Sequence, residues 1–279
     1  MIIWLASYPK SGNTLVRSML SAYYFSQDGN YNFQLIKNIK QFPHGGLFLK
    51  MGIDINNHNE TVKNYIKVQE SFNIKKSIQF LKTHSYLFNI ENQPFTNLDN
   101  SLGVIYAVRD PRNVVLSSSG HNSKTHEKST EDLIKGRILV ETKKEQVIVY
   151  PGTWSGNFNS WKSFKAVNKY FLIKYEDLVR DKEKSFYEIL NFIHKLKKVD
   201  FTLDKEKFQN TLDSTAFEVM QKMESEKGFK ESMVDKNTGK KIKFFNLGPN
   251  NDWKKLLDVN LKKEIENNFE KEMIELGYL

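Results

Sequence analysis

The sequence contains no cysteine and no apolar run near the ~20 residues that are needed to cross a bilayer. The missing cysteine excludes disulfide scaffolds, zinc–thiolate sites and cysteine nucleophiles. The opening run Met1–Ala6 is too short for the apolar part of a signal peptide, and no basic residue precedes it. We therefore expect a mature chain that starts at Met1, lies in the cytoplasm and is not associated with a membrane.

Charge and composition leave a wide choice of partners. The 42 basic and 33 acidic residues give a net charge of +9, and 39% of the 279 residues are hydrophobic. This is enough apolar material for a core, which excludes a disordered chain. The positive balance suits an anionic partner such as a nucleotide, a nucleic acid or an acidic polymer. Taken alone, however, it is explained more simply by a lysine-rich surface that keeps the protein soluble.

Short apolar runs alternate with helical patterns along the chain. Apolar periodicity of the helical kind begins at Thr14 and at Asp110-Pro111, where Asp suits the cap and Pro the first turn. Strands that alternate with helices predict an α/β fold, with a P-loop-like parallel sheet flanked by helices. The predicted strands are Ile2–Ala6, Ile78–Lys82, Gly103–Arg109 and Tyr170–Tyr175, and the predicted helices are Thr14–Tyr24, one from Asp110, Lys182–Lys195 and Lys262–Leu276.

The chain shows no internal repeat and no clear linker, so we expect a single domain over residues 1–279 with long loops. The largely polar stretches Ser26–Gln41 and Asp54–Lys76 are predicted to be insertions between elements. The most polar stretch, Gln221–Lys243, is predicted to be a mobile surface loop.

The sharpest local feature is the segment Ser7-Tyr8-Pro9-Lys10-Ser11-Gly12-Asn13-Thr14, which joins the first predicted strand to the first predicted helix. A loop that enters a helix N-terminus presents backbone N–H groups and the positive end of the helix dipole to an anion. Gly12 permits close approach of the backbone, and Lys10 adds a charge. The spacing is not that of a Walker A loop, because here the glycine follows the lysine. A capped helix with an incidental lysine is the alternative.

A second strand end has a similar character. Arg109 ends a predicted strand, and Ser117 follows two helical turns later. An arginine and a hydroxyl at a helix start form a plausible phosphate site. A surface arginine and an exposed serine would give the same sequence pattern. Two such sites in one parallel sheet fit a ligand that is phosphorylated at two separated positions.

A candidate base lies at a third strand end, in Lys82-Thr83-His84. Ligands of open α/β sheets bind at the carboxyl ends of strands, where a histidine can take a proton and a lysine can stabilise charge. A structural histidine is the alternative. The same three letters recur at Lys124-Thr125-His126 without a preceding strand, and we interpret that copy as incidental.

At these residues the sequence resembles the PAPS-dependent sulfotransferases (PAPS is 3′-phosphoadenosine 5′-phosphosulfate). Tyr8–Thr14 resembles their phosphosulfate loop, and Lys82-Thr83-His84 resembles their catalytic Lys-Thr-His. The segment with Arg109 and Ser117 resembles the one that grips the 3′-phosphate. The resemblance runs in order from residue 2 to about residue 254.

Downstream segments extend the resemblance. Tyr175-Glu176-Asp177 and Thr215-Ala216-Phe217 resemble family segments on the adenine side, and Phe244–Lys254 resembles a late element that contacts the 3′-phosphate. The family's usual Arg-Lys pair in that element is Asn246-Leu247 here, and Leu15 stands where many members have Trp. Gly152-Thr153-Trp154 and Trp161 also match, although we expect these tryptophans to serve core packing.

The resemblance implies a sulfotransferase that moves the sulfuryl group of PAPS to an acceptor hydroxyl or amine and releases 3′,5′-ADP. It implies catalytic roles for His84 as base and for Lys10 and Lys82 as stabilising cations, without a metal. The PAPS-binding residues would be Lys10, Ser11, Gly12, Asn13, Thr14, Arg109, Ser117, Tyr175, Thr215, Phe217, Asn246, Leu247 and Gly248.

Two alternatives stay open. A P-loop-type nucleotide kinase or phosphotransferase would use Lys10 and Thr14 on ATP and Mg²⁺, although only Asp110 offers a strand-end carboxylate for the metal. A non-catalytic polyanion-binding protein on the same fold would account for the positive charge. The acceptor is expected to be a small molecule or a glycan rather than a nucleic acid, and the oligomeric state is open.

Overall fold

A computed structural model describes residues 1–73, 77–139, 147–235 and 238–279. These residues group into two compact units, each assembled from separate stretches of the chain. The single domain expected over residues 1–279 stays a prediction. The first unit comprises Met1–Tyr8, Ile39–Val108 and Arg137–Thr202, and the second comprises Pro9–Asn38, Arg109–Gly136 and Leu203–Leu279.

A five-stranded parallel sheet forms the centre of the first unit, in the order β2-β3-β1-β6-β9. The four predicted strands are confirmed to within two residues at each end. The fifth strand lies at the edge of the sheet and was not predicted, because it is short and the sequence around it is polar. The strands are β1 (Ile2–Ser7), β2 (Lys40–Gln41), β3 (Gln79–Thr83), β6 (Ser101–Val108) and β9 (Tyr170–Lys174).

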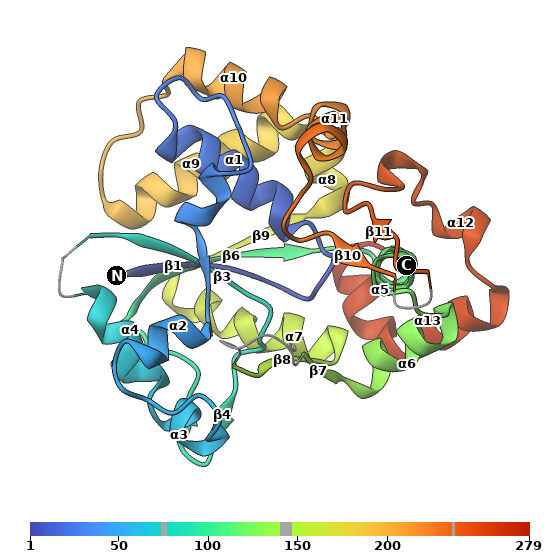
Figure 1. Ribbon diagram of the computed structural model, residues 1–279, viewed down its shortest axis with the longest axis horizontal. Coiled ribbons are helices and arrows are strands. Elements are labelled where there is room, and N and C mark those ends of the chain that lie inside the picture. Colours follow the sequence, from blue (N-terminus) through green and yellow to red (C-terminus); the bar gives the residue numbers. More distant parts are fainter. Residues whose placement is uncertain (74–76, 140–146, 236–237) are drawn as a thin grey trace. The chain divides into compact units, whose positions relative to one another are not determined.

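Helices cover both faces of this sheet (Figure 1). A side chain at Gly103 on β6 would collide with Leu196, which lies on α9 (Lys182–Lys197). Tyr106 on the same strand donates a 2.7 Å hydrogen bond to Asn157 on α7 (Trp154–Trp161). Positions 103 and 106 point to opposite faces of a strand, so α9 and α7 pack on opposite sides. The strands are therefore buried from both sides, which explains their continuous apolar runs.

The stretch Asp54–Lys76 is not an insertion without structure, contrary to the prediction, because two helices cross its described part. Their buried residues Val62, Tyr65 and Val68 recur at helical spacing among polar neighbours. Residues 74–76 lie outside the described residues. The remaining elements of this unit are α2 (Gly45–Leu49), α3 (His58–Lys63), α4 (Tyr65–Asn73), η2 (Lys162–Val167), α8 (Tyr175–Arg180), and the hairpins of β4 (Asn89–Ile90) with β5 (Gln93–Pro94) and of β7 (Arg137–Leu139) with β8 (Val149–Gly152).

Trp154 and Trp161 lie in the core, as expected. Trp161 packs against Trp4 at the centre of the sheet, with 6.1 Å between ring centroids. Its indole N–H donates a 3.1 Å hydrogen bond to the carbonyl of Ser85. The apolar ring and the polar N–H of this indole are thus both satisfied inside the first unit.

The second unit is mainly helical. Its predicted helices are confirmed, and α5 begins at Pro111, where the Asp110 side chain accepts a 2.9 Å hydrogen bond from the Arg112 N–H. The elements are α1 (Asn13–Phe25), η1 (Leu35–Asn38), α5 (Pro111–Asn122), α6 (His126–Lys135), α10 (Lys205–Ser214), α11 (Phe217–Lys227), η3 (Gly248–Asn250), α12 (Trp253–Leu256), α13 (Val259–Leu276), and a hairpin of β10 (Met233–Val234) with β11 (Lys241–Ile242).

The mobile loop predicted over Gln221–Lys243 is wrong for much of its described length. Helix α11 occupies its start, and the β10–β11 hairpin follows. Glu224 on α11 is buried and accepts backbone hydrogen bonds from Phe244 at 2.7 Å and from Phe245 at 2.9 Å. The Glu224 carboxylate therefore holds the backbone of Phe244 and Phe245 inside the second unit, although its polar character in the sequence suggested an exposed loop. Residues 236–237 lie outside the described residues.

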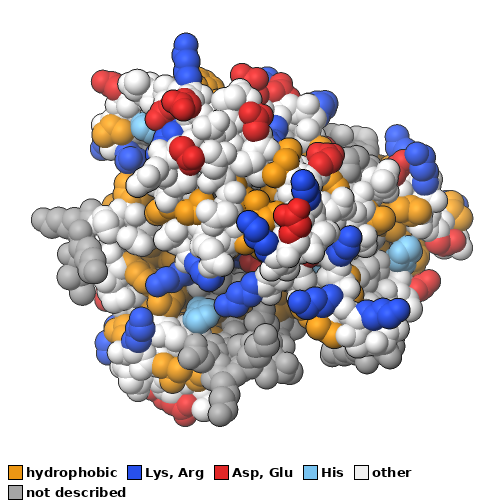
Figure 2. All heavy atoms as spheres, turned by 45° about the horizontal axis from the view of Figure 1, so that its top comes forward, with side chains coloured by type: hydrophobic (Ala, Val, Ile, Leu, Met, Phe, Trp, Pro, Cys, Tyr) orange, Lys and Arg blue, Asp and Glu red, His pale blue; other side chains and the backbone are white. Residues whose placement is uncertain are grey.

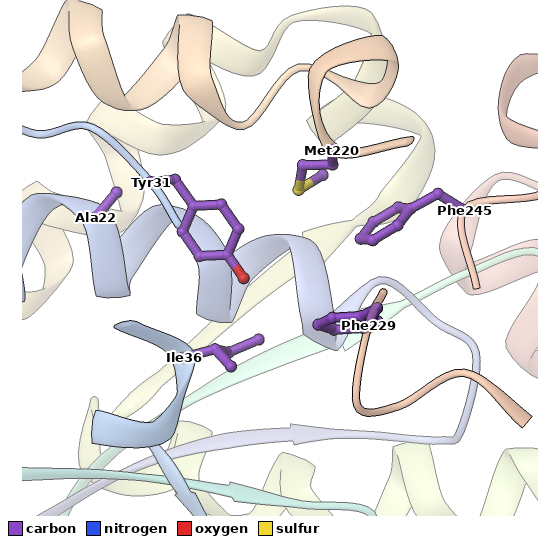
Figure 3. Packing of buried hydrophobic residues seen from close by; sticks show 6 residues of the cluster. All are labelled: Ala22, Tyr31, Ile36, Met220, Phe229 and Phe245. Carbon is purple, nitrogen blue, oxygen red and sulfur yellow. The ribbon is translucent and has the colours of Figure 1, made fainter. Parts of the chain in front are cut away.

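The predicted insertion Ser26–Gln41 likewise contributes to a core. Tyr31 and Ile36 from this stretch pack into a cluster with side chains of α1, α11 and the two segments that follow α11 (Figure 3). Burial raises the pKa of the Tyr31 phenol to about 12. The cluster is Ala22, Tyr31, Ile36, Met220, Phe229 and Phe245.

Among the described residues, no helix combines the length and apolar character that a bilayer crossing requires. On the face displayed in Figure 2, lysine and arginine side chains are spread widely, with acidic side chains among them.

Gly29 tests how tightly the second unit is packed. Gly29 has φ +86°, and a Cβ built there would lie 2.2 Å from the carbonyl oxygen of Lys207. We expect Gly29→Ala to lower the free energy of unfolding by about 3 kcal/mol or more, from left-handed strain and a backbone clash together. Urea denaturation measures this loss.

Gly52 is the matched control, since it has φ +72° and a Cβ placed there would have no atom of the described residues within 4 Å. Gly52→Ala should cost only the strain, about 1 kcal/mol. Equal losses for the two variants would contradict the close approach of Gly29 to Lys207.

Candidate functional site

The loop between β1 and α1 has a backbone shaped for an anion. Lys10 and Gly12 adopt left-handed angles, with φ +67° and +97°, and α1 starts at Asn13 without a side-chain cap. Residues that alternate in this way point successive N–H groups into one concavity. The Ser11 hydroxyl is buried there and has no hydrogen-bond partner among the described residues. A buried hydroxyl without a partner among the described residues, at a helix N-terminus, is what an oxyanion would complete.

Arg109 brings the second predicted anion segment to this loop. Its Nη1 donates a 3.3 Å hydrogen bond to the carbonyl oxygen of Lys10, and the side chain is buried. Ser117 lies half-buried on α5. The structure thus brings the two predicted anion-binding segments together at the Lys10 carbonyl and the Arg109 guanidinium.

The ammonium group of Lys10 lies over an aromatic ring. Its Nζ is 4.2 Å from the centroid of Phe244, a cation–π contact. The backbone of Phe244 is held in turn by the buried carboxylate of Glu224. The segment that contains Phe244 therefore contacts the loop that precedes α1.

Two residues of this site were missed by the sequence reasoning. Glu231 accepts a 3.1 Å hydrogen bond from the Thr14 hydroxyl and forms a 2.6 Å ion pair with Arg17. Arg17 stands three residues after Thr14 on α1, so helical spacing could have pointed to it. Glu231 lies 217 residues from Thr14 in sequence, and no local pattern connects the two.

The structure describes the predicted adenine-side residues of the second unit and the late element beside them. A Cβ at Gly248 would come within 2.5 Å of the Phe217 ring, so these two residues are in close contact. The Thr215 hydroxyl donates a 2.6 Å hydrogen bond to the Thr211 carbonyl of α10. Its proton is therefore used inside the protein. Asn246 and Leu247 are exposed.

In the first unit, Lys82 and His84 lie at the carboxyl end of β3. Strand β3 pairs with β1 so that Lys82 stands beside Leu5, and Lys82 is buried. His84 follows the strand directly, and its Nδ1 lies 2.9 Å from the carbonyl oxygen of Ser7. The Ser7 hydroxyl lies 3.2 Å from the same nitrogen.

The Ser7 carbonyl favours one tautomer of His84. A carbonyl oxygen only accepts hydrogen bonds, so the nitrogen that faces it carries the proton. In the neutral ring the lone pair then resides on Nε2, which is the nitrogen that can accept a proton. Asn157 donates a 2.9 Å hydrogen bond to the His84 carbonyl and so holds the backbone at this position.

One predicted boundary needs correction at Tyr175. The strand expected to end there stops at Lys174, and Tyr175 is the first residue of α8, where it is half-buried. The acidic residues Glu176 and Asp177 lie in the first turn of that helix, where the dipole favours them over a strand.

Comparison with known proteins identifies the family. Residues 2–277 match the family model described as the sulfotransferase domain. The chain belongs to the sulfotransferase family. Mouse sulfotransferase 2A6 is 23% identical over 176 residues, which are 61% of this sulfotransferase chain and 56% of that relative. The chain therefore spans little more than half the length of the curated relative that it matches.

Solved structures share the fold of this sulfotransferase-family chain. Mouse sulfotransferase SULT7A1, complexed with PAP, aligns with a TM-score of 0.55 at 19% identity, over 97% of this chain and 84% of that one. Retinol dehydratase in complex with androsterone and PAP aligns with a TM-score of 0.59 at 18% identity, over 98% and 80%. The predicted α/β fold and the predicted family are confirmed.

The hydrogen bond to Ser7 makes a prediction about His84 that nuclear magnetic resonance can check. The neutral ring should be the Nδ1–H tautomer, because the opposite tautomer would set a lone pair against the carbonyl oxygen. Two-dimensional ¹⁵N–¹H spectra of labelled protein distinguish protonated from unprotonated ring nitrogens. A neutral His84 ring protonated on Nε2 would show that the Ser7 carbonyl does not hold it.

Proposed function

We propose that this chain is a PAPS-dependent sulfotransferase that moves a sulfuryl group to a hydroxyl or amine of an acceptor by in-line displacement, with His84 as the general base. The observation that carries the proposal is the 2.9 Å contact between His84 Nδ1 and the Ser7 carbonyl, which leaves Nε2 as the proton acceptor. Family membership and the PAP bound in related structures support the choice of donor.

The residues of the α1 loop fit the donor's phosphosulfate end. Lys10, Ser11, Gly12, Asn13 and Thr14 would bind it with an ammonium, hydroxyls and backbone N–H groups, and the buried Ser11 hydroxyl, unpartnered among the described residues, supports this fit. When bound, PAPS supplies an activated sulfuryl group whose bond to the phosphate oxygen breaks as the bond to the acceptor forms, which releases 3′,5′-ADP.

The chain's own groups would act by position and charge. His84 Nε2 takes the proton of the acceptor, and the Ser7 carbonyl stabilises the imidazolium that results. Lys10 offsets the negative charge that develops on the bridging oxygen, and Lys82 offsets charge on the sulfuryl oxygens. Positioning and electrostatics of this kind supply most of the catalysis in the analogous transfer of phosphoryl groups.

Arg109 and Ser117 would bind the 3′-phosphate. The exposed side chains of Asn246 and Leu247 add no cation to this task, so Arg109 bears most of it. Phe217, beside Gly248, would pack on the adenine, with Tyr175 and Thr215 as further contacts on that side. A small molecule or a glycan with an accessible hydroxyl is the proposed acceptor, and a solved relative that binds androsterone supports the small molecule.

Transfer from labelled PAPS to a broad acceptor panel tests the function. His84→Ala should reduce turnover by at least about a hundredfold, because the proton has no acceptor, while its affinity for 3′,5′-ADP stays near that of the wild type. His126→Ala is the matched control, since His126 ends the same Lys-Thr-His tripeptide but begins α6. A fully active His84→Ala variant would remove the base from the mechanism.

The adenine contact can be tested by calorimetric titration with 3′,5′-ADP. A methyl group at Gly248 must displace the Phe217 ring, so Gly248→Ala should weaken binding at least about fivefold. Gly239→Ala introduces similar strain at φ +68° with no atom of the described residues within 4 Å, and its affinity should not change.

Two results of these titrations would argue against the assignment. Equal affinities of the two glycine variants would separate Phe217 from the nucleotide. Tighter binding of ATP with Mg²⁺ than of 3′,5′-ADP would favour a phosphotransferase over a sulfotransferase.

A further inference from the structure

The first turns of α1 already hold an anion that belongs to the protein. The carboxylate of Glu231 contacts the hydroxyl of Thr14 through Oε2 at 3.1 Å and the guanidinium of Arg17 through Oε1 at 2.6 Å. The side chain of Arg17 is 7% exposed and that of Glu231 is 27% exposed. An ion pair at this depth stands well apart from the solvated pairs of the surface.

This carboxylate uses groups that a phosphate would use. Carboxylate and phosphate oxygens bind guanidinium and hydroxyl donors with similar geometry, and both are favoured near a helix N-terminus. The Thr14 hydroxyl has one proton, and donating it to Glu231 prevents its donation to a ligand. The buried Ser11 hydroxyl, which has no partner among the described residues, lies in the same loop and points to a ligand there independently.

We propose that Glu231 is an internal competitor for the phosphate nearest α1, and that Arg17 becomes a ligand of that phosphate when Glu231 leaves. The inference rests on the proposed function, which assigns this loop to the 5′ end of the nucleotide. It adds two residues to that site and gives them opposite effects on affinity.

The backbone on either side of Glu231 is held by neighbouring contacts. Glu231 stands in a turn that is closed by a 3.1 Å hydrogen bond from the Ser232 N–H to the Phe229 carbonyl. Phe229 is anchored in the cluster of Figure 3, and the Ser232 hydroxyl donates to Glu224. Because the turn is held at both ends and the Glu231 side chain is 27% exposed, we assign the exchange to that side chain rather than to the backbone.

A selectivity follows from the competition. A ligand that brings a phosphate to the α1 loop replaces the carboxylate and gains its contacts. A ligand without that group, such as adenosine 3′-phosphate, leaves Glu231 in place and is insensitive to it. The carboxylate therefore favours nucleotides that are charged at the 5′ position.

Calorimetric titration of Glu231→Gln with 3′,5′-ADP tests the proposal. The amide keeps the size of the side chain and removes the competing charge, so 3′,5′-ADP should bind on the order of tenfold more tightly than to the wild type. Adenosine 3′-phosphate should bind both proteins equally. Glu226→Gln is the control, because Glu226 pairs only loosely with Lys222, at 4.0 Å on an exposed face of α11.

The double variant with Arg17→Gln and Glu231→Gln tests the role of Arg17. It should lose the gain in affinity, and retention of the full gain would overturn the assignment of Arg17. Unchanged or weaker binding of 3′,5′-ADP by Glu231→Gln would overturn the competition while the proposed function stands. Failure of the wild type to bind 3′,5′-ADP would overturn both.

Discussion

Strand β1 is the constraint on which the first unit and the proposed base, His84, depend. It pairs with β3 on one side and β6 on the other, and all six of its residues are buried. A strand held by two ladders cannot shift register without breaking both and exposing its apolar side chains. Its last residue, Ser7, therefore presents its carbonyl at a fixed place, and the imidazole of His84 is oriented against a rigid acceptor. If His84 is the proposed base, this backbone carbonyl has the orienting task that a carboxylate has in a catalytic triad.

In the second unit, two buried cations, Arg112 and Arg17, are paired with acidic side chains. Arg112 pairs with Asp110 at 2.7 Å and with Glu266, and its guanidinium stacks on Trp253. Such a pair is expensive to break because it would leave a buried charge alone. Arg17 differs in that its partner Glu231 is partly exposed and can be replaced by another anion without leaving the guanidinium uncompensated.

Much of the architecture was readable in the sequence because it depends on local pattern. The runs at Ile2–Ala6 and Gly103–Arg109 predict strands since both faces of the sheet are covered, and Asp110-Pro111 predicts the start of α5 from capping chemistry alone. Helices α3, α4 and α11 were missed because few of their residues are apolar, and the partners of those few lie elsewhere in the chain. The same limit applies to the site. The motifs that carry Lys10 and Arg109 were found in the sequence, whereas the hydrogen bond between these two residues, the contacts of Glu231 and the contact of the Ser7 carbonyl with His84 join residues far apart in the chain.

The placement of charge also bears on why the net charge of +9 is a poor guide to the ligand. A polyanion binder gains affinity from exposed cations that release counterions, and its binding falls steeply with salt. The cations that define the site here are of another kind. Arg109 and Arg17 are buried, and Lys10 lies over the face of Phe244. In a desolvated site, a cation–π contact of an ammonium group is weaker than its ion pair with a carboxylate. The Lys10 ammonium thus has an aromatic ring among its neighbours, whereas the Arg112 guanidinium is paired with a carboxylate. The net charge therefore says little about which anion the candidate site would take, because two of the cations there are buried arginines rather than exposed lysines.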